Sequence, residues 1–266
     1  MTLIPGVIVP PPEPLRSRYG LFTAASGPLD LPPHGEGGGI RYVPNTCGAA
    51  YAYGVHCYDE DNPAPDKPHD PDNPEVATGV FLALATLECS AVGYTLPEFQ
   101  DKVRRALAVS EQATVERALW TGRDLEGNPL DILTLTAEAE AVTDPYDPAS
   151  IASVVGALEQ YATEGYSFQP YLHAPAQVAA YAAEAGLIVQ DGPIKRTPGG
   201  SVWVFGAYPL GEIIVTGQTT LWRAQEVQVR DTFEPTTNLR LLVAERAWAA
   251  SFDCLAGRAD FTPVGS

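Results

Sequence analysis

The longest helical pattern in the chain runs from Thr95 to Thr121. Thr95 and Glu98 have the spacing of a capping box at its start, and Gly122 supplies the stop. About 27 residues at 1.5 Å per residue predict a rod of roughly 40 Å. Its apolar residues form a narrow stripe at helical spacing: Leu96, Phe99, Val103, Ala106, Leu107, Val115, Leu119 and Trp120. Such a stripe predicts a helix that lies along the subunit as a beam, outside a compact core.

Two further helices and a series of strands follow from the same patterns. A second helix is expected from Asp147 to Gly165, and a third from near Pro175 to Gly186. Strand patterns cover residues 40–58, 76–89, 130–136, 202–205, 212–217, 219–224 and 226–230. Residues 239–257 fit both helical spacing and strand alternation, so periodicity leaves that segment open. Strands and helices come in separate blocks, which predicts an α+β arrangement.

The first 39 residues are rich in proline and end in the glycine-rich loop 35–39. Proline fixes φ and blocks helix formation, so this segment is expected to be an extended arm. Its apolar anchors are Leu15, Tyr19, Leu21 and Phe22. They favour a strap that becomes ordered on a neighbouring subunit; a flexible tail is the alternative.

Residues 59–75 join two strand patterns and combine many acids with many prolines. The acids are Asp59, Glu60, Asp61, Asp66, Asp70, Asp72 and Glu75. A long, stiff and acidic connection between two strands predicts a protruding hairpin.

The chain has 16 Lys and Arg against 33 Asp and Glu, a formal net charge of −17. A field of that sign repels phosphate, so we expect weak or no direct binding to nucleic acid. One interpretation of the negative charge is that it keeps the protein soluble. The other is that it lets a surface of the protein lie beside nucleic acid without binding it. The start of the chain lacks the basic residues of a signal peptide, and the longest apolar run, Val76 to Leu87, is too short to cross a bilayer. No membrane partner is expected.

Candidate metal chemistry centres on Cys47, His56 and Cys57, with His69 further on. These residues and the nearby acids suggest a metal-dependent enzyme as an alternative function. The paired C-x-x-C spacing of a compact zinc site is absent, so we expect no metal and no cofactor. Four cysteines are too thinly spread for a disulfide scaffold and are expected to be free thiols in a reducing cytoplasm: Cys47, Cys57, Cys89 and Cys254.

Other catalytic signals are weak. The chain has no G-x-S-x-G and no H-E-x-x-H motif, and loop 35–39 lacks the Lys and Ser or Thr of a phosphate cradle. The acids Glu138, Glu140 and Asp144 are interpreted as solvated charge. His173 comes just before the third helix and is expected to cap it. We therefore expect a protein that is not an enzyme.

The order of these elements resembles the Hong Kong 97 fold, which tailed-bacteriophage major capsid proteins share with encapsulin shells. In that family an N-terminal arm precedes an extended two-stranded loop, a long spine helix, an axial domain and strands that return to a peripheral domain. The segments that carry the resemblance are 18–22 (RYGLF), 59–75, 98–122, 173–188 (HAPAQVAAYAAEAGLI), 196–209 (RTPGGSVWVFGAYP), 212–217 and 241–257. The resemblance also favours β structure for the last of these.

The resemblance implies an α+β fold with five parts. These are an N-terminal arm (1–39), an extended loop (40–94), the spine helix with the first part of the peripheral domain (95–145), the axial domain (146–235) and the return strands (236–266).

The resemblance also implies a structural role. The chain would be a major capsid protein of a virion, assembled in the host cytoplasm into pentamers and hexamers of an icosahedral shell around double-stranded DNA. Decoration or scaffolding proteins would be further partners, and an encapsulin-like compartment shell is the alternative. The residues expected between subunits are Tyr19, Phe22, Tyr58, Lys67, Arg104 and Arg105.

Overall fold

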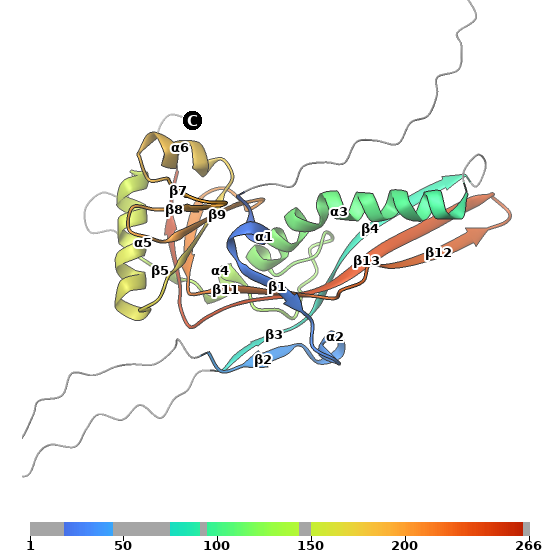
Figure 1. Ribbon diagram of the computed structural model, residues 1–266, viewed down its shortest axis with the longest axis horizontal. Coiled ribbons are helices and arrows are strands. Elements are labelled where there is room, and N and C mark those ends of the chain that lie inside the picture. The colour runs from blue at the N-terminus through green and yellow to red at the C-terminus, as the bar shows by residue number, and fades with distance from the viewer. Residues whose placement is uncertain (1–18, 45–74, 91–94, 144–149, 263–266) are drawn as a thin grey trace, which may run out of the picture.

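The computed structural model describes residues 19–44, 75–90, 95–143 and 150–262. Within these ranges the subunit is elongated, with one long helix lying along a β-sheet and a second sheet with two helices at one end (Figure 1). One sheet has five strands, another has seven, and a short third sheet has two. No helix in the described ranges has both the length and the apolar character needed to cross a bilayer.

Helix α3 spans Leu96–Thr121 and confirms the predicted beam. The Thr95 backbone N–H donates to Glu98 Oε2 at 2.7 Å, and Gly122 ends the helix with a φ of 63°. The expected stripe is buried except at Leu96, which is 37% exposed, and at the exposed Ala106. The helix packs along strands β4 (Phe81–Ser90) and β13 (Leu239–Phe252), so its narrow apolar face has a sheet to cover (Figure 1).

The five-stranded sheet is organised around β13. Strands β11 (Thr219–Arg223) and β12 (Gln228–Glu234) pair antiparallel with successive parts of β13, and β4 pairs antiparallel with it from Leu239 to Trp248. Strand β1 (Ser26–Asp30) runs parallel to β11. The segment that periodicity left open is therefore a strand. Its even-numbered residues Leu242, Ala244, Trp248, Ala250 and Phe252 are buried, as the alternation indicated.

The seven-stranded sheet has the order β5-β14-β10-β6-β9-β8-β7. The strands are β5 (Glu140–Ala141), β6 (Tyr171–Pro175), β7 (Val189–Asp191), β8 (Ile194–Arg196), β9 (Val202–Gly206), β10 (Glu212–Thr216) and β14 (Ala256–Asp260). Helices α5 (Ile151–Gly165) and α6 (Val178–Glu184) lie beside it (Figure 1). Ser150 caps α5, because its hydroxyl accepts from the Ser153 N–H at 3.0 Å.

The remaining elements are short. They are α1 (Leu21–Ala24), α2 (Gly35–Gly38), α4 (Leu135–Glu138) and the antiparallel pair β2 (Ile40–Tyr42) and β3 (Val76–Thr78). The single strand expected over 76–89 is thus two strands, β3 and β4, which belong to different sheets. The chain between them passes Gly79, where an added Cβ would lie 1.8 Å from the Asp131 carbonyl oxygen.

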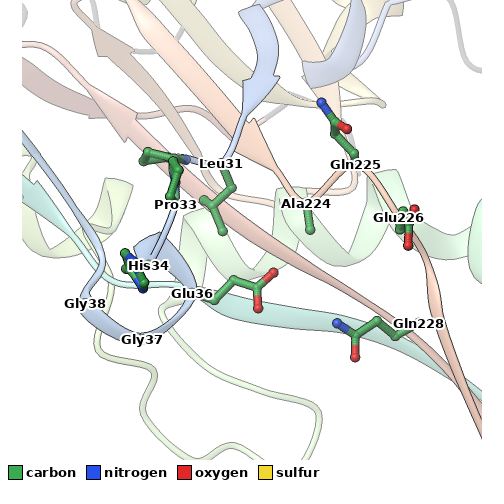
Figure 2. Close-up of a pocket in the computed structure, with 11 residues that line it drawn as sticks. Leu31, Pro33, His34, Glu36, Gly37, Gly38, Ala224, Gln225, Glu226 and Gln228 are labelled. Atoms are coloured by element: carbon green, nitrogen blue, oxygen red, sulfur yellow. The ribbon is translucent and has the colours of Figure 1, made fainter.

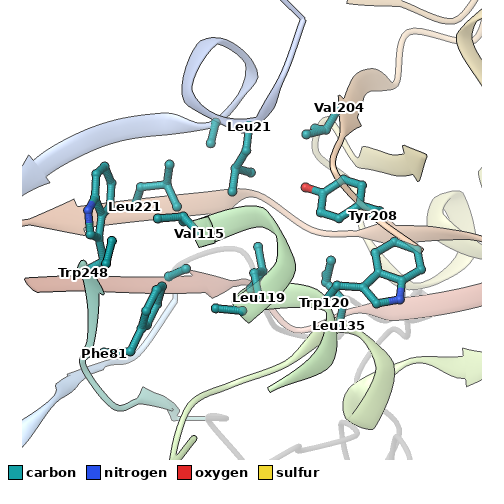
Figure 3. Close-up of a cluster of buried hydrophobic side chains, with 14 of the residues drawn as sticks. Leu21, Phe81, Val115, Leu119, Trp120, Leu135, Val204, Tyr208, Leu221 and Trp248 are labelled. Atoms are coloured by element: carbon teal, nitrogen blue, oxygen red, sulfur yellow. The ribbon is translucent and has the colours of Figure 1, made fainter. Parts of the chain in front are cut away.

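The core has two clusters of buried side chains. The larger fills the space between α3, α1 and the two sheets, and Figure 3 shows Trp248, Leu119 and Tyr208 among its members. The second lies between α5, α6 and the seven-stranded sheet. The larger cluster contains residues of both sheets, such as Trp248 of β13 and Val204 of β9. The subunit thus has two packed units, one built on each sheet, that meet in this shared cluster near Trp120 and Tyr208, whose rings stack at 4.9 Å.

Several expectations were wrong. No strand runs through Thr136; that residue is in α4, whose N-terminus is capped by the Thr134 hydroxyl. The part of the expected arm that the structure describes, residues 19–39, packs into the subunit because Leu21 is fully buried and β1 joins the sheet. The later strands are divided between the two sheets, since β11 and β12 belong with β13 while β14 joins the seven-stranded sheet.

Candidate functional site

The first half of α3 presents a basic, solvent-exposed face. Lys102, Arg104 and Arg105 are exposed there beside the exposed acids Glu98 and Asp101, so three cations and two acids give this stretch a net charge of +1 in a chain that has only 16 Lys and Arg. Arg104 pairs with Asp101 at 3.5 Å. Val109, one turn after Arg105, is 64% exposed. This surface, here called the basic face of α3, combines positive charge with exposed apolar area, as protein interfaces do.

The two expected arm contacts lie at the start of the described chain and touch their own subunit. The Phe22 ring stacks on Trp248 with centroids 4.7 Å apart. Tyr19 is 39% exposed, and the Lys195 ammonium lies 4.7 Å from its ring centroid. Their roles between subunits stay predictions.

The other expected contacts, Tyr58 and Lys67, lie outside the described residues, as do the candidate metal ligands Cys47, His56, Cys57 and His69. In the described ranges no three His, Cys, Asp or Glu side chains are grouped so that they could hold a metal ion. The expectation of free thiols is wrong for Cys254, which is disulfide-bonded.

The face of the five-stranded sheet opposite α3 carries exposed apolar side chains. Leu82 and Leu84 on β4 are 52% and 46% exposed, and Leu241 on β13 is 42% exposed. Alternation explains this, since their neighbours Ala83 and Leu242 point toward α3 and are fully buried. A row of exposed leucines on a sheet is a surface suited to contact with another protein.

A hollow of about 910 Å³ lies between the 31–38 loop and the connection from β11 to β12 (Figure 2). Glu36, Glu226 and Gln225 line it together with apolar and glycine residues. It brings together no nucleophile with a base, and carboxylates at its wall disfavour a phosphate. The glycine-rich loop forms the short helix α2, entered through His34 with a φ of 66°.

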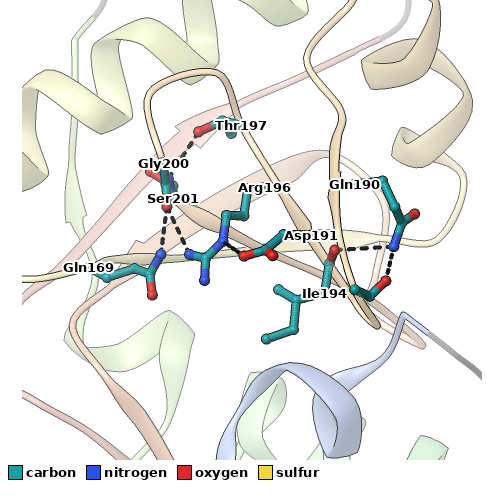
Figure 4. Close-up of polar contacts among 9 residues, drawn as sticks. Gln169, Gln190, Asp191, Ile194, Arg196, Thr197, Gly200 and Ser201 are labelled. Carbon is teal, nitrogen blue, oxygen red and sulfur yellow. Dashed lines mark hydrogen bonds and ion pairs between the residues drawn. The ribbon is translucent and has the colours of Figure 1, made fainter.

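At the far end of the seven-stranded sheet, polar contacts fix the turn between β8 and β9 (Figure 4). Arg196 Nε donates to Asp191 at 2.6 Å across the β7–β8 hairpin, and the Gln169 amide donates to the Gly200 carbonyl at 2.8 Å. Ser201 donates to Glu159 on α5 at 2.6 Å. Near this ordered end, Phe168 is 59% exposed.

Buried polar residues are the part of the structure that the sequence did not reveal. Glu111 and Glu116 lie on the covered side of α3, 6% and 2% exposed. Glu111 accepts from Trp248 Nε1 at 2.9 Å and from Arg246 at 3.3 Å. Glu111 lies four residues from both Leu107 and Val115, and Glu116 lies three residues before Leu119 and four before Trp120, so a carboxylate within the apolar stripe was the available signal.

His173 does not cap a helix. It lies on β6, fully buried, with Nδ1 3.2 Å from the Tyr208 hydroxyl and Nε2 3.1 Å from both Thr216 and Thr219. Burial lowers its pKa to about 3, so the ring is neutral. Because Thr216 is on β10 and Thr219 on β11, the imidazole bonds to both sheets at the place where the chain crosses between them.

No protein-family model matches the sequence, and no curated protein is significantly similar to it. Solved structures are similar over almost the whole chain. A subunit from the capsid of an empty GTA particle gives a TM-score of 0.58 at 11% identity, covering 98% of this chain and 95% of that chain. A structure from Microbacterium phage Oxtober96 gives 0.58 at 11% identity, over 99% and 96%. One from Gordonia phage Cozz gives 0.55 at 12% identity, over 95% and 89%.

The protein therefore has the Hong Kong 97 fold, the fold of capsid subunits, with α3 in the place of the spine helix. The resemblance and the α+β fold class expected from the sequence are both confirmed.

Proposed function

We propose that the protein is a major capsid protein that assembles into the pentamers and hexamers of an icosahedral phage shell around double-stranded DNA. The observation that carries the proposal is the match of the entire subunit, end to end, to a capsid subunit of a GTA particle, which is described with C5 symmetry. The likeness covers 98% of this chain and 95% of that chain.

The subunit's surfaces support this role. Helix α3 lies along one face of the five-stranded sheet (Figure 1). The basic face of α3 and the leucine row on β4 and β13 are both exposed, so each is available to another copy. Subunits that meet through two different surfaces form a ring when the rotation between neighbours closes. The net charge of −17 suits a wall that encloses DNA, because packed DNA is repelled from it and does not adhere.

We infer that the acidic segment 59–75 of one subunit meets the basic face of α3 of its neighbour. That segment carries seven acids and the single lysine Lys67, whereas the first half of α3 exposes Lys102, Arg104 and Arg105. Opposite charges at an interface steer association and fix its register. Tyr58 and Lys67 would then reach the neighbour from the loop, and Tyr19 and Phe22 would reach it from the start of the described chain.

The five-part division expected from the sequence stays part of the proposal: arm, extended loop, spine helix with peripheral domain, axial domain and return strands. The expected location is the virion after assembly in the host cytoplasm, with decoration or scaffolding proteins as further partners.

Charge reversal on α3 tests the proposed contact. Arg105→Glu should lower the fraction of expressed chain that sediments as particles by at least tenfold, because it places a carboxylate opposite the acidic segment. Arg123→Glu is the matched control, since it reverses an exposed cation just beyond the other end of the helix. Equal particle yields for the two variants, measured by sedimentation velocity, would contradict the contact.

The contents of natural particles separate the phage shell from a compartment shell. Mass spectrometry of purified DNA-filled particles should identify this chain as their most abundant polypeptide. Its presence only in particles that hold a protein cargo and no DNA would favour the encapsulin-like alternative instead.

A further inference from the structure

The first described residues, 19–21, pass between α3 and the seven-stranded sheet; they are called the strap below. The Tyr19 carbonyl accepts from the Phe205 N–H of β9 at 3.0 Å, and the Tyr19 ring lies under the Lys195 ammonium of β8. Leu21, two residues later, is fully buried in the larger core cluster. The strap therefore touches both packed units of the subunit.

Glu116 joins the strap to both units through its carboxylate. Its Oε1 accepts from the Leu21 N–H at 2.9 Å and from Gln112 Nε2 at 2.8 Å, and its Oε2 accepts from the Ala207 N–H at 2.7 Å. Leu21 belongs to α1, Gln112 to α3, and Ala207 to the turn that follows β9. One side chain thus bonds three elements that are far apart in the sequence.

Each of the two residues that donate a backbone N–H to Glu116 is preceded by a glycine. A Cβ on Gly20 would lie 1.7 Å from Gln112 Nε2 and 2.6 Å from Glu116 Oε1. A Cβ on Gly206 would lie 2.8 Å from Glu116 Cδ. Glycine immediately before each donating residue lets the two backbones approach the carboxylate this closely.

The carboxylate depends on these donors. Burial raises the pKa of Glu116, while the three hydrogen bonds and Arg117 act in the opposite direction. A buried carboxylate that loses a donor is left partly unsatisfied, which is unfavourable. Beside it, Trp120 stacks on Tyr208, and His173 bonds to Thr216 and Thr219 of the two sheets. Glu116 is the directional contact at this junction that includes the strap.

We propose that Glu116 and the strap form a fastening, that is, a contact that fixes how the two sheets are oriented relative to each other. While Glu116 accepts hydrogen bonds from the Leu21 and Ala207 amides, the two sheets keep this orientation. Release of the strap lets the sheets rotate. A change in that orientation alters the angle between neighbouring subunits, so the strap sets the curvature of the shell. This last consequence depends on the proposed function, whereas the fastening itself does not.

Hydrogen–deuterium exchange on the full-length chain tests the fastening. In Glu116→Gln the side-chain NH₂ faces a backbone N–H, so one of the two amides loses its acceptor. Exchange in fragments covering 19–25 and 205–209 should rise at least tenfold together, while fragments from β13 and α5 stay within twofold of the wild type. Ala207→Pro removes the donor from the other side and should give the same pattern. Ala207→Ser keeps the N–H and should leave exchange unchanged.

Two results would overturn the proposal. One is exchange that rises equally in every fragment of Glu116→Gln, or in neither of the two named fragments. The other needs no variant: wild-type amides of Leu21 and Ala207 that exchange as fast as exposed amides would show that the carboxylate does not hold them.

Electron microscopy of the assembled variants then tests the effect on curvature separately. Wild-type shells of one size and Glu116→Gln shells of mixed size are expected, and identical size distributions would contradict the curvature step. If the wild type forms no shells while the exchange pattern appears, the proposed function fails and the fastening stands.

Discussion

Mild acid should destabilise the subunit through His173. The imidazole is fully buried, and burial lowers its pKa from 6.5 to about 3. As the pH falls, the unfolded chain binds a proton near pH 6.5, whereas the folded subunit binds none until about pH 3. The stability that depends on the neutral ring is therefore complete above pH 6.5 and is lost as the pH drops toward 3.

The size of this effect follows from the gap between the two pKa values. At pH 5 the unfolded histidine is about 1.5 pH units below its pKa, and each unit corresponds to about 1.4 kcal/mol, so the loss is about 2 kcal/mol. Typical domains have only about 5–15 kcal/mol of stability. A protonated ring would also lose its acceptor role toward the Tyr208 hydroxyl, which lies 3.2 Å from Nδ1.

Urea unfolding of the wild type and of His173→Gln, followed by the fluorescence of the buried Trp203 and Trp248, measures the effect. The carboxylates are common to both proteins, so their titration cancels in the difference between the two free energies of unfolding. We expect the wild type to be more stable at pH 7.5 and its advantage to shrink by about 2 kcal/mol at pH 5.0. A difference that stays constant over this range would refute the reasoning.

Two further predictions concern packing and backbone conformation. Trp248→Ala should lower the free energy of unfolding by about 3–5 kcal/mol, because the ring is fully buried, stacks on Phe22 and donates to the buried Glu111. Urea unfolding at pH 7.5 measures this loss, and a loss below about 1 kcal/mol would contradict the prediction. Gly156→Ala, in the open middle of α5, should raise the melting temperature, whereas Gly122→Ala should lower it, because that residue has a φ of 63° and its Cβ would lie 2.5 Å from Thr134. Calorimetry on both variants checks the sign, and a shift in the same direction would contradict the assignment.

The spine helix could be predicted because its signals are local. The capping box at Thr95, the periodic stripe and the terminating Gly122 all lie within one stretch of sequence and need no distant partner. Helix α5 and strands β9 to β12 were found for the same reason. Each of these elements carries its own period and its own end signals.

Features that depend on distant pairing could not be predicted. The sequence of β13 was ambiguous because this segment becomes a strand by pairing with β4, β11 and β12, which come from two other parts of the chain. Residues 19–30 look like a free arm in the sequence, yet they pack in because Glu116 and β11 supply partners about 100 and 190 residues away. For the buried acids Glu111 and Glu116 the one local signal is their position within the apolar stripe, because their donors Trp248 and Ala207 lie far away in the sequence.

The central claim is that copies of this chain build a closed shell. The most direct measurement is electron cryomicroscopy of the purified full-length protein at high concentration. The account predicts closed particles whose reconstruction has rings of five subunits at its vertices, with α3 of each subunit against a neighbour. A solution that holds only single, monodisperse subunits under all assembly conditions tried would contradict it.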